Sequence, residues 1–162
     1  MTATAGDIAA NTITALEVTI ASRLQAEFPD LAVEPFPDDP EEYRLNSPIG
    51  ALLVRYHGAK YGDATDVHVM AQEKSAAVEI TLVFRRLDGK EGVYHHLDAV
   101  RAALTGFVPE GWERLRPLAE EFVFQQGGLW RYAMDFVTQT VVMEILPPDN
   151  APVLTQVQYV DK

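Results

Sequence analysis

The run AAVEITLVFRR, residues 76–86, alternates apolar and polar side chains over almost its whole length. Successive side chains of a β-strand point to opposite faces of a sheet, so this run predicts a strand with one buried face. The polar face carries Glu79, Thr81 and Arg85. The buried face is predicted to hold Ala76, Val78, Ile80, Leu82 and Phe84.

Other stretches also have the composition of strands. LAVEPF, residues 31–36, predicts a short one, and IGALLVRYHG, residues 49–58, predicts a longer one that alternates at Leu52, Val54 and Tyr56. DVHVMAQ, residues 66–72, is predicted as a separate strand with Val67, Val69 and Ala71 on one face. Residues 37–48, PDDPEEYRLNSP, lie between the first two of these stretches. They contain three prolines and predict an irregular acidic loop.

Two stretches have helical periodicity. The first spans residues 7–28, with Asp7 at the N-cap position and Pro29 ending it. Its apolar stripe consists of Ala9, Ile13, Leu16, Ile20, Leu24 and Phe28. The second lies within residues 93–106, with Gly106 as its C-cap. Its stripe consists of Tyr94, Leu97, Val100 and Leu104.

The order of these elements predicts the fold class. A helix, several strands, a second helix and a final pair of strands favour an α+β fold, with two helices packed on one face of a mainly antiparallel sheet. Pro147-Pro148 ends the pattern, so we expect one domain over residues 1–148. Residues 149–162 then form a C-terminal tail, either an edge strand or a flexible arm.

Charge and composition exclude several functions. The chain carries 13 basic and 24 acidic residues, a net charge of −11, and the first fifty residues contribute much of it. Such a chain repels phosphate, so we expect no sequence-specific nucleic-acid partner. We expect no membrane span and no secretory signal, because apolar runs of the required length are missing. The chain has no cysteine, which excludes disulfides and thiol chemistry and favours the cytoplasm.

The candidate catalytic and metal-binding residues lack the spacing that such chemistry needs. His95 and His96 are adjacent on a helix and point about 100° apart, so they cannot share one ion. His57 and His68 each stand alone on a predicted strand. Neither a nucleophile elbow nor a phosphate-binding glycine loop is present. We therefore predict no catalytic residue, no cofactor and no metal, and a protein that is not an enzyme.

In the last pair of strands, residues 121–126 and 129–146, the simplest pairing leaves aromatic side chains on both faces of the sheet. A two-residue turn at Gly127-Gly128 pairs Phe124 with Arg131 and Phe122 with Ala133, which places both phenylalanines on one face. Two explanations remain open: a three-residue loop with a bulge at a left-handed glycine, or a second face that meets another chain. The second predicts an interface formed by Trp130, Tyr132, Phe136, Phe122 and Phe124.

Two segments carry a family resemblance. They are SPIGALLVRYHGAKYGD, residues 47–63, and YHHLDAVRAALTGFVPEGWERLRPLAEEFVFQQGGLWRYAMDFVTQTVVME, residues 94–144. Over about residues 8–146 the chain resembles the tail-terminator (tail-completion) family of Mu-like bacteriophages and prophages. The resemblance implies a non-enzymatic subunit that closes with its own copies into a hexameric ring. Such a ring caps the tail tube protein, stops its polymerisation and presents a docking surface to the head connector protein. It also implies assembly in the bacterial cytoplasm and incorporation into the virion tail.

The alternative function is a small non-enzymatic ligand-binding or regulatory α+β domain, with a pocket between helix and sheet. In the tail-terminator interpretation DNA passes through the ring, and a negatively charged channel keeps it mobile. We hypothesise that the acidic loop then lies at the lumen or at an axial surface of the ring, the alternative being a solvated peripheral loop without a role. Its acids are Asp38, Asp39, Glu41 and Glu42.

Overall fold

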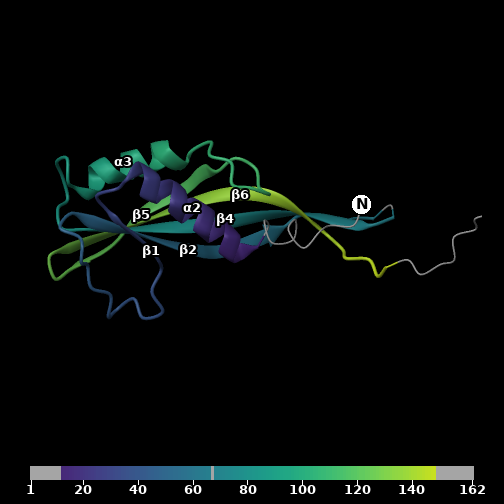
Figure 1. Cartoon of the computed structure of the whole chain (residues 1–162), viewed down its shortest axis with the longest axis horizontal. Coiled ribbons are helices and arrows are strands. Elements are labelled where there is room, and N and C mark those ends of the chain that lie inside the picture. Colours follow the sequence, from purple (N-terminus) through teal and green to yellow (C-terminus); the bar gives the residue numbers. More distant parts are fainter. Residues whose placement is uncertain (1–11, 67, 149–162) are drawn as a thin grey trace, which may run out of the picture.

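The structure, a computed structural model, describes residues 12–66 and 68–148 of the 162-residue chain. Figure 1 shows a twisted sheet with two helices lying across one of its faces. The helices are α2 (Ile13–Glu27) and α3 (Val93–Leu104). The strands are β1 (Ala32–Pro35), β2 (Gly50–Tyr61), β3 (Thr65–Asp66), β4 (Met70–Phe84), β5 (Arg116–Gln126) and β6 (Leu129–Met143).

The strands form one mixed sheet in the order β1-β2-β4-β6-β5, with the short β3 pairing beside β4. Only β1 and β2 are parallel, and the other pairs are antiparallel. This arrangement confirms the predicted α+β class and its mainly antiparallel sheet. β2, β4 and β6 extend beyond the ends of the helices, so the molecule is elongated along the strands (Figure 1).

Strand β4 is longer than the sequence pattern predicted. Residues 66–72 and 76–86 were predicted as two strands, but one strand runs from Met70 to Phe84. The intervening residues contain no glycine or proline that would turn the chain. Lys74 instead pairs with Tyr61 on β2 and with Thr140 on β6, so hydrogen bonding on both sides keeps this segment extended. Thr65 and Asp66 fold back separately as β3.

Helix α2 begins later than predicted. Its N-cap is Thr12, whose hydroxyl accepts a hydrogen bond from the backbone N–H of Ala15 at 3.2 Å. The predicted cap Asp7 and the apolar Ala9 lie outside the described residues. The core-facing part of the stripe is confirmed, because the fully buried residues of the helix are Leu16, Ile20 and Leu24.

Helix α3 buries a different first-turn residue from the one predicted. Tyr94 is exposed, whereas His96 is buried on the core side. The Nδ1–H of His96 donates to the carbonyl oxygen of Gly92 at 2.8 Å, and its ring packs 4.5 Å from that of Phe84. Leu97, Val100 and Leu104 are buried as predicted. Gly106 follows the actual C-cap, Thr105, and has φ 83°, the left-handed geometry that ends many helices.

The sheet is buried on both faces near the hairpin end. The main core lies between the helices and the sheet and includes the predicted face of β4, from Ala76 to Phe84. A smaller cluster lies on the other face, where the irregular loop of residues 36–48 covers Ala51, Leu53 and Val83. On that face the predicted polar residues Glu79 and Thr81 are only 8% and 5% exposed, so this face of β4 is buried as well. Neither described helix has the length and apolarity that crossing a membrane requires.

Candidate interaction surface

The β5–β6 hairpin turns through Gly127 and Gly128. Their φ angles are 61° and 75°, in the left-handed region that glycine adopts readily, and Gln126 pairs with Leu129 across a two-residue turn. Turns with positive φ at both central residues match the twist of the flanking strands. The explanation by a three-residue loop is therefore wrong.

A bulge inside β5 resolves the conflict between its two phenylalanines. Phe124 pairs with Arg131 as the turn predicts, but Phe122 pairs with Tyr132 rather than with Ala133, because Val123 is an extra residue in the strand. One extra residue reverses the side to which all following side chains point. Phe122 and Phe124 therefore lie on opposite faces of the hairpin, contrary to the prediction.

Phe122 joins a partly exposed group of rings on the helix side of the sheet. We call Tyr94, Phe122, Trp130 and Tyr132 the aromatic cluster. The ring centroid of Phe122 lies 5.4 Å from that of Tyr132 and 6.2 Å from that of Trp130. The ring centroids of Tyr94 and Tyr132 are 6.1 Å apart. Phe122 is 51% exposed and Tyr94 44%. The cluster is thus packed internally and still presents large apolar surface to solvent.

The other two predicted interface residues have different surroundings. The ring of Phe124 lies on the opposite face with the guanidinium of Arg131 4.9 Å from its centroid, and it is 39% exposed. Phe136 is completely buried in the main core. Its side chain stabilises the fold and is not part of the surface.

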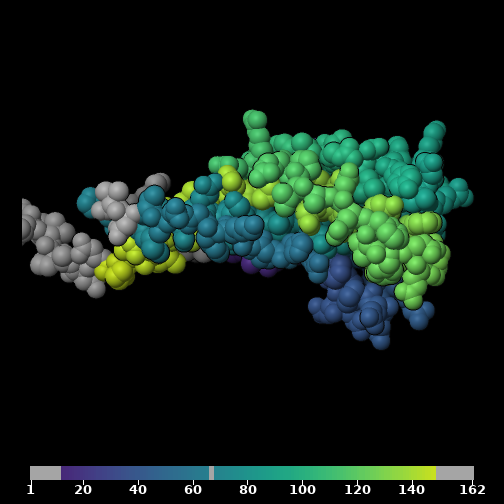
Figure 2. Space-filling model, turned by 180° about the vertical axis from the view of Figure 1, so that it is seen from behind, coloured from purple at the N-terminus to yellow at the C-terminus, as the bar shows by residue number. Residues whose placement is uncertain are grey.

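Strand β5 is one of the two edge strands of the sheet, opposite β1, and all eleven of its residues are exposed. Leu118 and Val123 expose apolar side chains along it, in addition to the phenylalanines. An edge strand has one row of backbone donors and acceptors without strand partners, which another chain can use. Figure 2 shows the hairpin in green at one end of the molecule, beside the dark blue loop of residues 36–48.

That loop is tied to the sheet at its base and carries its acids outward. The hydroxyl of Tyr43 donates to the carboxylate of Glu34 at 3.0 Å, and burial, followed by this contact, raises the pKa of Tyr43 to about 12. Arg85 donates to the carbonyl oxygen of Leu45 at 3.0 Å. The loop projects from the face opposite the helices (Figures 1 and 2). Its exposed acids are Asp38, Asp39, Glu41 and Glu42.

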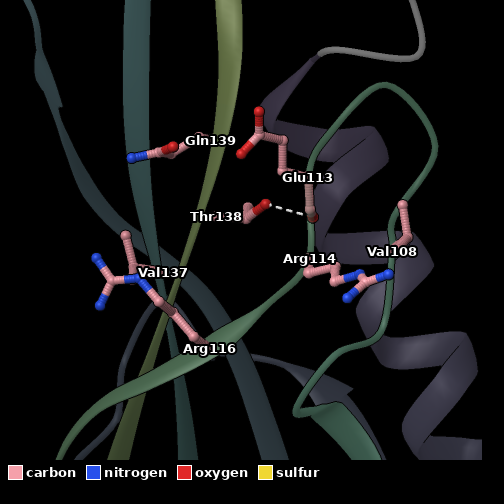
Figure 3. Close-up of a pocket in the computed structure, with 7 residues that line it drawn as sticks. All are labelled: Val108, Glu113, Arg114, Arg116, Val137, Thr138 and Gln139. Carbon is pink, nitrogen blue, oxygen red and sulfur yellow. Dashed lines mark hydrogen bonds between the residues drawn. The ribbon is translucent and has the colours of Figure 1, made fainter.

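A surface cavity of about 390 Å³ lies where the connection after α3 meets β6. The hydroxyl of Thr138 donates to the carbonyl oxygen of Glu113 at 2.7 Å and holds the connection against the strand (Figure 3). Arg114 and Arg116 line the cavity and form no ion pair within the described part of the chain. The full lining is Val108, Glu113, Arg114, Arg116, Val137, Thr138 and Gln139.

The histidines are distributed differently from the sequence expectation. His95 and His68 are exposed, and burial is the main cause that lowers the pKa of His96. His57 does not stand alone, because strand pairing places it beside Glu79 and Asp135. The local spacing considered in the sequence could not indicate this group, since its members come from three different strands.

These features define a two-layer α+β protein with exposed apolar side chains on an edge hairpin. The model of the Gp37 protein family matches residues 20–161, so the chain belongs to the Gp37 family. The comparison with curated proteins found no match. Among solved structures, the fold is similar to a chain in "Virion of native gene transfer agent (GTA) particle". The TM-score is 0.51 at 15% identity, and the match covers 82% of this chain and 99% of that one.

Proposed function

We propose that this chain is a non-enzymatic structural subunit of a phage-like particle and, more closely, a tail terminator. In this role its copies form a hexameric ring that caps the tail tube and offers a docking surface to the head connector. The observation that carries the proposal is the fold shared with a chain of a gene transfer agent virion over nearly that whole chain. The resemblance of residues 8–146 to tail terminators of Mu-like phages supports the same role.

Ring closure makes a specific demand on the surface. A head-to-tail ring joins two different patches of each subunit, and the patches must be complementary. The hairpin offers an apolar patch, with Phe122 and Phe124 on its two faces and the open edge of β5 between them. Backbone hydrogen bonds to an open edge provide affinity, and flanking side chains provide specificity.

The acidic loop has a separate role in the proposed ring. It lies on the face opposite the helices (Figures 1 and 2), and its exposed acids are Asp38, Asp39, Glu41 and Glu42. In the ring it faces the lumen or an axial surface, where negative charge repels phosphate and keeps passing DNA mobile.

The alternative of a ligand-binding domain places a pocket between the helices and the sheet. Core side chains occupy that space: Leu16 and Ile20 of α2 pack in the same cluster as Ile80 and Leu82 of β4, and all four are fully buried. The ring proposal uses the exposed surfaces instead.

Sedimentation velocity and negative-stain electron microscopy test the proposal, with and without purified tail tubes of the same particle. We expect the wild-type chain to form rings on tube ends, with a mass about six times that of the 18.0 kDa chain. Particles assembled without the chain should carry tubes of uncontrolled length.

The hairpin is tested with the double variant Phe122→Glu/Phe124→Glu, which should remain folded by circular dichroism and lose ring formation. Val18→Glu is the matched control, because Val18 is 58% exposed on α2 and lies outside the hairpin. Rings that form equally well in both variants would remove the hairpin from the interface. A wild-type chain that neither binds tube ends nor limits tube length would refute the tail-terminator role itself.

A further inference from the structure

Three potential metal ligands meet at the centre of the sheet, on the face opposite the helices. His57 comes from β2, Glu79 from β4 and Asp135 from β6. Glu79 and Asp135 are direct partners across neighbouring strands. His57 lies at an irregularity of β2, where Tyr56 pairs with Val78 and Gly58 with the adjacent Ala77. This bulge leaves His57 as the extra residue of the strand.

The distances between the donor atoms are close to those of a tetrahedral site. His57 Nδ1 lies 3.3 Å from Asp135 Oδ1 and 3.7 Å from Glu79 Oε2. In a tetrahedral zinc site with bonds of 2.0–2.1 Å, neighbouring ligand atoms are roughly 3.4 Å apart. One ligand atom from each residue lies within 4.8 Å of the other two. Small side-chain rotations therefore bring the three donors around one ion.

The surroundings of Glu79 orient its carboxylate toward this point. Arg55 Nε and one terminal nitrogen of its guanidinium lie 3.0 Å and 2.9 Å from Oε1, and the hydroxyl of Thr81 lies 3.4 Å from the same oxygen. The guanidinium is itself held 4.6 Å from the ring centroid of Phe36. Because Oε1 is occupied by these donors, Oε2 is the oxygen directed at His57. Partners of this kind orient ligands in established metal sites.

We propose that His57, Glu79 and Asp135 form a binding site for a divalent transition metal, with Zn²⁺ as the ion of choice. One imidazole nitrogen and two carboxylate oxygens are donors that zinc accepts, and three protein ligands leave a further position for water. The side chain of His57 is 50% exposed, so that position is open to solvent. The ion joins β2, β4 and β6 and compensates two adjacent carboxylates, of which Glu79 is the one that pairs with Arg55.

Calorimetric titration of the tag-free, chelator-treated full chain with ZnCl₂ tests the site, and native mass spectrometry gives the stoichiometry. We expect about one zinc per chain, and a rise in melting temperature on binding, because a ligand that binds only the folded state stabilises it. Co²⁺ serves as a spectroscopic probe, with the visible absorption of a tetrahedral complex expected.

Two variants locate the site without disturbing the buried Glu79. His57→Ala and Asp135→Asn should each weaken zinc binding at least tenfold while the chain stays folded. His95→Ala is the control, since His95 is exposed on α3 and outside the group. If the three side chains form only an ion-pair network, the wild-type chain will bind no zinc, or His57→Ala will bind it as well as the wild type. Either result overturns the proposal, and neither depends on ring formation.

Discussion

Phe122 faces Tyr132 across the β5–β6 pair, with 5.4 Å between their ring centroids, because Val123 is inserted into β5 between Phe122 and Phe124. Without that residue Phe122 would lie on the other side of the hairpin, opposite Ala133. The bulge distributes the exposed aromatic rings over both faces of an edge strand. A surface of this kind can contact neighbouring chains on two sides. A subunit of the proposed ring needs such contacts, because it has a neighbour on each side.

The turn that forms this hairpin should be sensitive to side chains at both glycines. We expect Gly127→Ala/Gly128→Ala to lower the free energy of unfolding by about 1–2 kcal/mol, because both residues have positive φ. An added Cβ would meet nothing within 4 Å at either position, so the cost is conformational. Urea unfolding measures it. Gly62→Ala is the control, since its Cβ would make an ordinary contact at 3.5 Å, and a similar loss there would contradict the explanation.

The two aromatic environments should differ in their contribution to stability. Phe136→Ala is expected to cost about 3–5 kcal/mol, because the ring is completely buried and its removal leaves a cavity. Phe122→Ala should cost about 1 kcal/mol or less, because half of that ring is already in water. Denaturant melts of the two variants compare them directly. Equal losses would mean that Phe122 is a core residue and not a surface one.

The buried His96 should make stability depend on pH. Burial, as the largest cause, lowers its pKa below the usual value, so the unfolded chain binds a proton at this position more readily than the folded chain. The part of the stability that depends on neutral His96 is therefore fully present above a pH of about 6.5 and is lost as pH falls below it. We expect His96→Asn to show a smaller decrease in unfolding free energy between pH 7 and pH 5. An unchanged slope would exclude His96 as its source.

The acidic loop is the feature that we propose to face the lumen or an axial surface of the ring. Changing its acids to lysine should leave the fold intact and impair tail completion or DNA ejection, because cationic side chains hold passing phosphate. The residues to change are Asp38, Asp39, Glu41 and Glu42.

The control is a second variant in which four other exposed acids are changed to lysine, with the same change in net charge. It should leave tail completion and DNA ejection unaffected. These acids are Asp63, Glu73, Glu91 and Glu110. If the loop variant completes tails and ejects DNA like its parent, the loop is peripheral.

Features that depend on neighbouring residues in the chain could be predicted from the sequence. The alternation from Ala76 to Phe84 indicated the buried face of β4, and Gly127-Gly128 indicated the hairpin turn, because both depend on local backbone geometry. The helical stripe of Leu16, Ile20 and Leu24 was equally local. Tyr94 was misplaced because helical spacing alone cannot decide whether it or His96 reaches the core. That choice depends on Phe84, which lies on another element.

Strand pairing decided the features that involve surfaces and sites. No sequence pattern marks Val123 as an extra residue, since a bulge is defined only by the register against β6. The same holds for His57, Glu79 and Asp135, which meet only because β2, β4 and β6 lie side by side in one register. Periodicity along a chain reports which side of an element is apolar. Which side chains touch across elements is set by long-range hydrogen bonding, and a shift of one residue moves every later side chain to the other face.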